Sequence, residues 1–323
     1  MPLSERPWLP LAAVATTLLL WASAFVAIRH LGADFSAGAL SLGRLLVGSV
    51  ALGAVAVPRG LPRPSGRDWL GLVAIGVLWF GVYNVALNQG EHHVDAGTSA
   101  MLIQISPVLI AVLATLFLGE RFTPWLAIGL VLAFAGVVLI GLSQPGGRND
   151  LVGVLLCLLA ALVYSIALVI QKPLVSRLSA IHVTWLACTV GAVACLPFAG
   201  QLVDATRHAS ASDIWWVVYL GLFPTAIAFT TYAFALRHMT ASNLGITTYL
   251  VPPITILMGW VFLGETPPGM AYAGGALALV GVAIARRKTR TPAAQTSGEA
   301  GPVPAPEMEP CSPLTGPAEA EPR

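Results

Sequence analysis

The chain has 323 residues, of which 56% are hydrophobic and only 10% are charged, and its mean hydropathy is +0.79. Soluble domains carry about 25% charged residues, so this composition excludes an ordinary cytosolic enzyme, a disordered protein and a secreted disulfide scaffold. A net charge of +2 is too small for a nucleic-acid-binding protein, and what remains is a polytopic membrane protein.

Ten apolar runs follow one another, and each is close to the ~20 residues that cross a bilayer core. They are 10–28, 37–57, 69–88, 98–118, 124–142, 151–171, 181–199, 214–236, 243–263 and 268–285. Only short polar or Gly/Pro-rich joints separate them, so we expect a single all-α bundle of ten transmembrane helices. Ala22-Ser23-Ala24 resembles a signal-peptide cleavage site, but nine more runs follow, and we interpret the first run as a retained span.

The basic residues predict the orientation of the bundle. Twelve Lys and Arg residues fall on one side of the predicted spans, and only Arg29, Arg148 and Arg207 fall on the other. The positive-inside rule therefore predicts a multi-pass protein of the cytoplasmic (inner or plasma) membrane with both termini in the cytoplasm. Residues 286–323 are rich in Pro, Ala, Gly and Glu, which predicts a disordered cytoplasmic tail.

The sequence matches itself after a shift of 145 positions. ISPVLIAVLATLFLGERFTPWLAIGLVLAFAGVV, from Ile105, aligns with LVPPITILMGWVFLGETPPGMAYAGGALALVGVA, from Leu250. Five spans is an odd number, so the second copy starts on the opposite side of the membrane. We therefore expect two inverted five-helix repeats, residues 9–142 and 151–285. Inverted repeats are typical of alternating-access transport, and a duplication that serves stability alone is the other interpretation.

The motifs resemble a known superfamily. WASAFVAIRHL near Trp21, LGRLLVG around Arg44 and the paired LFLGERFTPWLAIGLVLAFAGV and VFLGETPPGMAYAGGALALVGV stretches resemble the drug/metabolite transporter superfamily, in particular its EamA-type ten-span transporters. The resemblance covers roughly residues 11–285. It implies a secondary transporter, an exporter or exchanger of small metabolites such as amino acids or drug-like compounds, with no single substrate.

Polar residues inside spans are costly and mark candidate sites. Arg44 lies about two turns inside the second run, where a cation can attract a carboxylate, or snorkel toward headgroups. Gln104 and its counterpart Tyr249 precede prolines that free backbone carbonyls, so two broken helices can face a central cavity or merely kink. The candidate cavity residues are Trp21, Arg44, Asn84, Asn88, Gln104, Tyr164, Tyr232, Thr247, Thr248 and Tyr249.

The duplicated Pro and Gly-Glu positions are assigned a structural role, as hinges and helix caps. They are Pro107, Gly119, Glu120, Pro252, Pro253, Gly264 and Glu265. The loop QGEHHVDAG offers Glu91, two histidines and Asp95, residue types that can hold a metal or relay protons. We interpret it as a solvated loop and predict no metal site. We also predict no catalytic residue and no cofactor, since no P-loop, HExxH motif or intramembrane Asp pair is present.

Two other classes of function stay open at this point. An intramembrane enzyme acting on lipid or peptide needs a nucleophile–base pair or a metal set, and a membrane scaffold or sensor needs a soluble module. A small-molecule substrate and the lipid bilayer are the partners that the sequence predicts. The absence of carboxylates from the middle of the spans favours a facilitator or an exchanger over proton coupling.

Overall fold

The computed structural model describes residues 8–118, 124–142, 148–238, 244 and 247–285. Over these residues the chain is helical and contains no strand, and each of the ten apolar runs is helical over most of its described length. The calls on Gly119, Glu120 and the tail 286–323 lie outside the described residues. The helices are α1 (Trp8–Leu31), α2 (Ala37–Ala56), α3 (Gly66–Ile75), η3 (Gly76–Val82), α4 (Tyr83–Glu91), α5 (Ala96–Ile103), α6 (Ser106–Leu118), α7 (Pro124–Leu142), α8 (Arg148–Arg177), α9 (Ala180–Ala194), α10 (Ala199–His208), α11 (Ala211–Leu220), η5 (Gly221–Ile227), α12 (Ala228–His238), α14 (Val251–Leu263) and α15 (Gly269–Ala285), with short turns η2 (Val57–Arg59), η4 (Leu196–Phe198) and η6 (Thr248–Leu250).

Five helical segments among the described residues are long and apolar enough to cross a membrane. They are Trp8–Leu31, Ala37–Arg59, Gly66–Glu91, Leu151–Arg177 and Ala211–His238. A sixth is present if Ala180–Ala194 and Leu196–His208, which are bent by 52°, form one span. The remaining apolar helices are shorter, so the count of ten spans stays a prediction.

Two segments 145 positions apart share an unusual local structure. Ser65 and Asp68 form a capping box at the start of α3, and Ser210 and Asp213 form the same box at the start of α11. Capping boxes satisfy backbone donors that a helix start leaves free. Each of these helices then continues into a seven-residue π-helix, η3 or η5. π-Helical turns are rare and occur often at functional sites.

Each π segment packs on a helix from the other part of the chain. A methyl group added at Gly76 in η3 would lie 2.6 Å from Val190 Cβ in α9. One added at Gly221 in η5 would lie 2.5 Å from Val47 Cβ in α2. Only glycine permits such close approach, because any Cβ there would overlap its neighbour.

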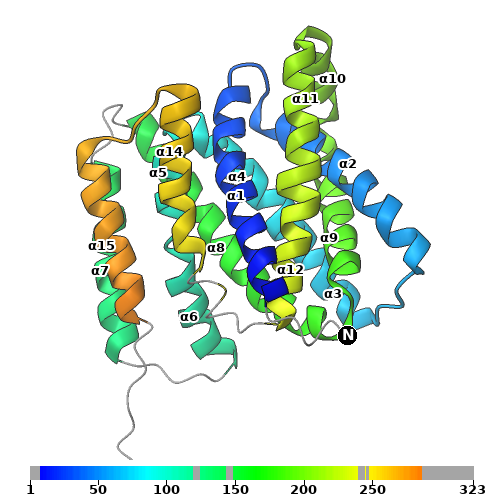
Figure 1. The fold of residues 1–323 in the computed structure, drawn as a ribbon, viewed down its shortest axis with the longest axis horizontal. Helices are drawn as coiled ribbons and strands as arrows, with labels where there is room; N and C mark the ends of the chain where they lie inside the picture. Colours follow the sequence, from blue (N-terminus) through cyan, green and yellow to red (C-terminus); the bar gives the residue numbers. More distant parts are fainter. Residues whose placement is uncertain (1–7, 119–123, 143–147, 239–243, 245–246, 286–323) are drawn as a thin grey trace, which may run out of the picture. The chain divides into compact units, whose positions relative to one another are not determined.

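Helices α7 and α15 form a second close pair, and they lie side by side (Figure 1). Cβ atoms at Gly136 and Gly274 would each come within 2.7 Å of the other glycine's carbonyl oxygen. A Cβ at Gly281 would lie 2.7 Å from Gly129 O. Small residues let helix backbones approach closely within a membrane.

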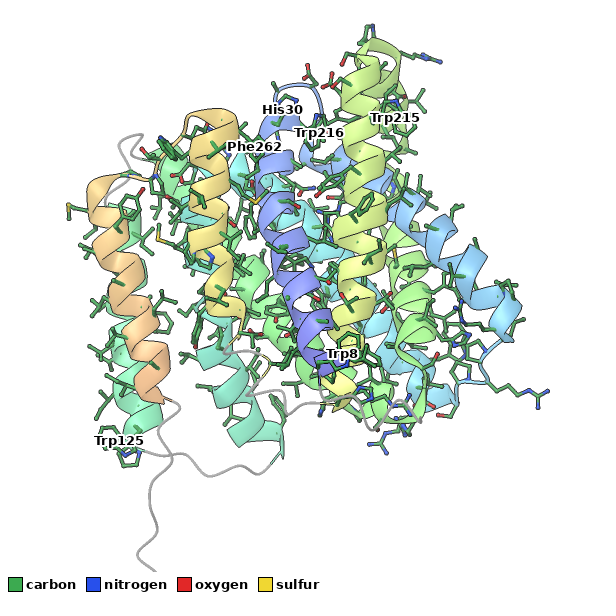
Figure 2. The ribbon with its side chains drawn as sticks, in the orientation of Figure 1. Trp8, His30, Trp125, Trp215, Trp216 and Phe262 are labelled. Atoms are coloured by element: carbon green, nitrogen blue, oxygen red, sulfur yellow. The ribbon has the colours of Figure 1, made fainter. Side chains whose placement is uncertain are left out.

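The described chain starts and ends at the same end of the bundle, since α1 begins and α15 finishes at the bottom of Figure 1. Trp8 and Trp125 lie toward that end, whereas Trp215, Trp216 and Phe262 lie toward the opposite one (Figure 2). The side chains of Trp8 and Trp215 are mostly exposed. Exposed tryptophans at two levels are typical of the two interfaces of a membrane.

Candidate functional site

A small cavity lies among helices from both parts of the chain, and its volume is about 40 Å³. That is room for roughly two or three water molecules, well below the several hundred Å³ of a typical ligand pocket. Its lining consists of Trp21, Ala24, Phe25, Ile28, Arg44, Trp79, Tyr83, Leu87, Ala100, Ile103, Gln104, Tyr164, Phe229, Thr248 and Val251. The cavity is therefore too small for a metabolite, which can enter only after the surrounding helices rearrange.

Aromatic rings form most of one wall. The ring of Trp21 lies 5.6 Å from Phe229, 6.4 Å from Trp79 and 6.5 Å from Tyr164, measured between centroids. The edge-to-face geometry of these pairs is the arrangement that aromatic quadrupoles prefer. Behind this wall the hydroxyl oxygens of Tyr164 and Tyr232 are 2.7 Å apart and share a hydrogen bond.

Arg44 supplies a positive charge to this apolar space. Its side chain is 3% exposed, and its Nε donates to Thr225 Oγ1 at 3.0 Å. Thr225 in turn donates to Leu220 O, at 2.8 Å, where the π-helix η5 displaces the regular bonding. Among the described lining residues Arg44 is the sole cation and there is no carboxylate. A buried charge that lacks an ionic partner favours an anionic ligand.

Gln104 ends α5 at a break in the fourth apolar run. Its Nε2 donates to the backbone oxygen of Thr248, at the start of the η6 turn. Helix α6 restarts at Ser106, which places Pro107 in its first turn, and Pro252 and Pro253 occupy the first turn of α14. Two helix breaks, one from each part of the chain, thus meet at the cavity.

The structure brings five of the ten predicted cavity residues to the described lining and places the other five away from it. Asn84 Nδ2 donates to Phe80 O at 2.8 Å, within its own helical segment, and Asn88 Nδ2 donates to Ser41 Oγ at 2.9 Å, across to α2. Both amide nitrogens are thus engaged in packing, while among the described residues neither Oδ1 has a hydrogen-bond partner. Thr247 bonds to Leu244 O, Tyr232 stands behind Trp21 and Tyr164, and Tyr249 is half-buried. None of these five is among the described lining residues.

The Gly-Glu pair after α14 lies beside α1. Gly264 ends α14 with φ of 67°, a left-handed conformation that glycine adopts without strain. Glu265 follows, and its carboxylate accepts from Arg29 Nε at 3.1 Å. Arg29 Nη1 also donates to the backbone oxygen of Glu91 at 2.7 Å. One guanidinium therefore joins α1, α4 and the turn after α14.

The interpretation of QGEHHVDAG as a solvated loop is wrong for its first acid. Glu91 is the last residue of α4 and is 1% exposed. Asp95 is the N-cap of α5, and its carboxylate accepts from Thr98 N at 2.8 Å. Among the described residues no group of three His, Cys, Asp or Glu side chains is arranged to hold a metal ion.

Comparison with known proteins identifies the fold's family. A model of the EamA-like transporter family matches residues 8–142 and, a second time, residues 151–287. The chain belongs to this family. It is therefore a transporter embedded in a membrane, with several apolar spans and a small-molecule substrate, as the resemblance predicts.

Individual relatives of this EamA-like protein agree with that assignment. A protein of Streptantibioticus cattleyicolor named "Probable terminal-alkyne amino-acid exporter" is 38% identical over 291 residues, covering 90% of this chain and 96% of the relative. YdfC of Bacillus subtilis, an uncharacterized transporter, is 33% identical over 265 residues, covering 81% and 86%. A crystal structure shares the fold with a TM-score of 0.61 at 22% identity, covering 86% of this chain and 96% of the other.

Four aromatic lining residues of the EamA-like chain were missed by sequence reasoning, namely Phe25, Trp79, Tyr83 and Phe229. A signal for two of them was present. Positions 79, 83 and 87 are four residues apart and share one helix face, and Leu87 also lines the cavity. Phe229 sits one turn before Tyr232, and only its contact with Trp21 reveals its place.

Proposed function

We propose that the protein exports or exchanges amino acids with apolar side chains, by alternating access, across the cytoplasmic membrane. The observation that carries the proposal is Arg44, a buried cation that faces a cavity walled by aromatic rings and, among the described lining residues, opposed by no carboxylate. A substrate carboxylate would pair with Arg44, while the apolar part of the substrate would lie against Trp21 and its neighbours.

The recognition of an amino group has a candidate as well. The side-chain oxygen of Gln104 and the hydroxyls of the tyrosine pair are acceptors close to the lining, and the rings can accept a cation over their faces. The name of the Streptantibioticus relative, an amino-acid exporter, supports the same class of substrate.

Alternating access would arise from two inverted five-helix repeats, residues 9–142 and 151–285. The glycine contacts support this arrangement because they are reciprocal: Gly76 meets α9 as Gly221 meets α2, and Gly136 meets Gly274 as Gly129 meets Gly281. Such reciprocity is what a two-fold relation between two units produces. Inverted repeats place the substrate between the halves and rock around it.

The proposed orientation puts both termini in the cytoplasm and the Arg29 end outside. It rests on the distribution of basic residues, and the common end at which α1 begins and α15 finishes in Figure 1 is consistent with it. On this proposal the small cavity is the substrate path in a closed form, and it must widen at one end to admit a solute.

Exchange in proteoliposomes tests the proposal. Vesicles loaded with unlabelled leucine, phenylalanine or methionine are given the labelled amino acid outside, and uptake above protein-free vesicles is expected. The corresponding amino-acid amides, which lack the carboxylate, should compete poorly. No exchange with any member of the panel, or equal competition by the amides, would reject the substrate class.

A further inference from the structure

A buried acid near the cavity has no role in substrate binding as described. Glu91 is 1% exposed, and among the described residues neither of its carboxylate oxygens has a hydrogen-bond partner. Leu87, one turn earlier on α4, lines the cavity, and so does Tyr83, two turns earlier. Glu91 thus lies just beyond the cavity's end, on the same helix face.

Arg29 touches Glu91 without touching its carboxylate. The guanidinium donates through Nη1 to the Glu91 backbone oxygen, at 2.7 Å, and through Nε to Glu265, at 3.1 Å. An arginine carries five N–H donors in one plane. Because Arg29 already contacts both residues, its remaining donors are available to the Glu91 carboxylate if the side chain turns away from Glu265.

Other titratable and charged groups surround Glu91 on every side. They are Arg29 on α1, Arg44 on α2, Tyr83 on α4 itself, His92 and His93 in the following turn, Asp95 at the start of α5, Cys157 on α8 and Glu265 after α14. Asp95 is engaged with Thr98, and Arg44 with Thr225. Arg29 is the cation already in hydrogen-bond contact with the residue, so it is the partner that an ionised Glu91 would recruit.

A carboxylate that is buried and unbonded is stable only as the neutral acid, because an unpaired buried charge is costly. We propose that Glu91 is a proton-binding site, and that its titration decides whether Arg29 binds Glu265 or Glu91. With the proton bound, Arg29 ties α1 to the turn after α14. When the proton leaves to water, Arg29 neutralises the new carboxylate and releases Glu265. The inference rests on the proposed transport function, since it makes the opening of this end depend on a proton.

Spin-label distances test the switch without any substrate. Nitroxide labels are placed at Asp34, in the turn after α1, and at Met270, near the start of α15, both of which are exposed. Cys311 is replaced by serine, and the described cysteines are buried. In lipid, the distance between the two labels is measured at several pH values, and it should lengthen as the pH rises. Glu91→Gln should hold the short distance throughout, and Glu265→Gln, which removes the tie, should give the long one throughout.

The matched control is Asp204→Asn, an acid-to-amide change at an exposed position of α10, which should follow the wild type. Infrared spectra give an independent reading, since the C=O band of a protonated carboxylic acid should be present at neutral pH and absent from Glu91→Gln. A pH response in Glu91→Gln equal to the wild type's, or a wild type that shows no response, would overturn the inference. Neither reading needs transport, so failure of the substrate class and failure of the switch are separate outcomes.

Discussion

The two ends of the bundle share one backbone contact and differ in the side chains that use it. At one end Arg29 donates to the backbone oxygen of Glu91 at 2.7 Å. At the other, Lys172 donates to the backbone oxygen of Leu236, also at 2.7 Å. Lys172 and Leu236 are 143 and 145 positions further along the chain. The carbonyl contact is thus repeated, but the buried acid is present at one end and replaced by leucine at the other.

The contacts of the π segments differ in the same way. Gly221 packs on α2 beside Arg44, and a Cβ added at Gly221 would lie 2.8 Å from the backbone oxygen of Arg44. Gly76 packs on α9 beside Ala187, and a Cβ added there would lie 2.7 Å from the backbone oxygen of Ala187. The backbone geometry is common to both contacts, and only one carries a cation. We infer that the duplicated framework shapes the bundle, and that the two charged groups proposed to bind substrate and proton, Arg44 and Glu91, belong to the first copy.

The largest expected effect breaks the shared framework. Gly76→Ala and Gly221→Ala each place a Cβ within 2.6 Å of a valine Cβ, and overpacking of this kind costs about 1–3 kcal/mol. Both variants should lower the thermal stability measured by fluorescence-detected size exclusion, and by similar amounts. Gly200→Ala, in a helix with open space around it, is the control and should be neutral. A loss confined to one variant would contradict a common framework.

The next largest effect is expected from removing the charge of Arg44, which distinguishes the Gly221 contact from the Gly76 contact. Arg44→Ala removes a hydrogen bond to a charged group, worth about 1.5–3 kcal/mol, and should weaken substrate binding about 10- to 100-fold. Half-saturation of exchange in proteoliposomes measures it. Ala187→Ser, at the matching place in α9, should leave exchange unchanged. Arg44→Ala protein that is well folded and fully active would remove Arg44 from the substrate site.

A smaller effect is expected where Arg44 is positioned by another residue. Thr225→Val deletes the oxygen that accepts from Arg44 Nε at 3.0 Å. Thr225 contacts Arg44 and not the proposed substrate, so only part of this hydrogen bond's contribution should reach the substrate affinity, which should fall about 2- to 10-fold. Thr225→Ser keeps the accepting oxygen and should retain the wild-type affinity. If serine fails to rescue, the effect comes from packing in η5 and not from the hydrogen bond.

The part of the site predicted from sequence depends on the repeat. The alignment of Pro107 with Pro252 predicted two helix breaks that face one cavity. Gln104 and Thr248, which lie at these breaks, are joined by a hydrogen bond and line the cavity. The alignment of Trp21 with Tyr164 likewise brought two lining residues together. The helices themselves follow from the apolar runs, because backbone groups in lipid must be satisfied within a segment.

The sequence alone does not predict which polar residues in or near the ends of the spans are buried by contacts with other helices. Glu91 lies in a polar stretch of sequence that is typical of a loop. In the structure α4 extends to Glu91, and the Arg29 side chain contacts it. Asn84 and Asn88 are polar residues in a span, as cavity residues are, but their amides meet backbone and serine oxygens. In each case the deciding partner lies on another helix or one turn back, which the order of residues alone does not give.

The smallest expected effect sharpens the comparison of the two ends. The residue after Glu91 is His92, whereas the residue after Leu236 is Arg237. Burial lowers the pKa of His92 from its usual value of 6.5, and His93 and Arg29 lower it further. The unfolded chain then binds this proton more readily than the folded one, so the contribution of His92 to stability is complete above about pH 6.5 and is lost as the pH falls below it. His92→Gln should therefore lose less thermal stability on acidification than the wild type. It should keep the pH-dependent spin-label shift, because that shift belongs to Glu91. A shift abolished by His92→Gln would transfer the switch to the histidine.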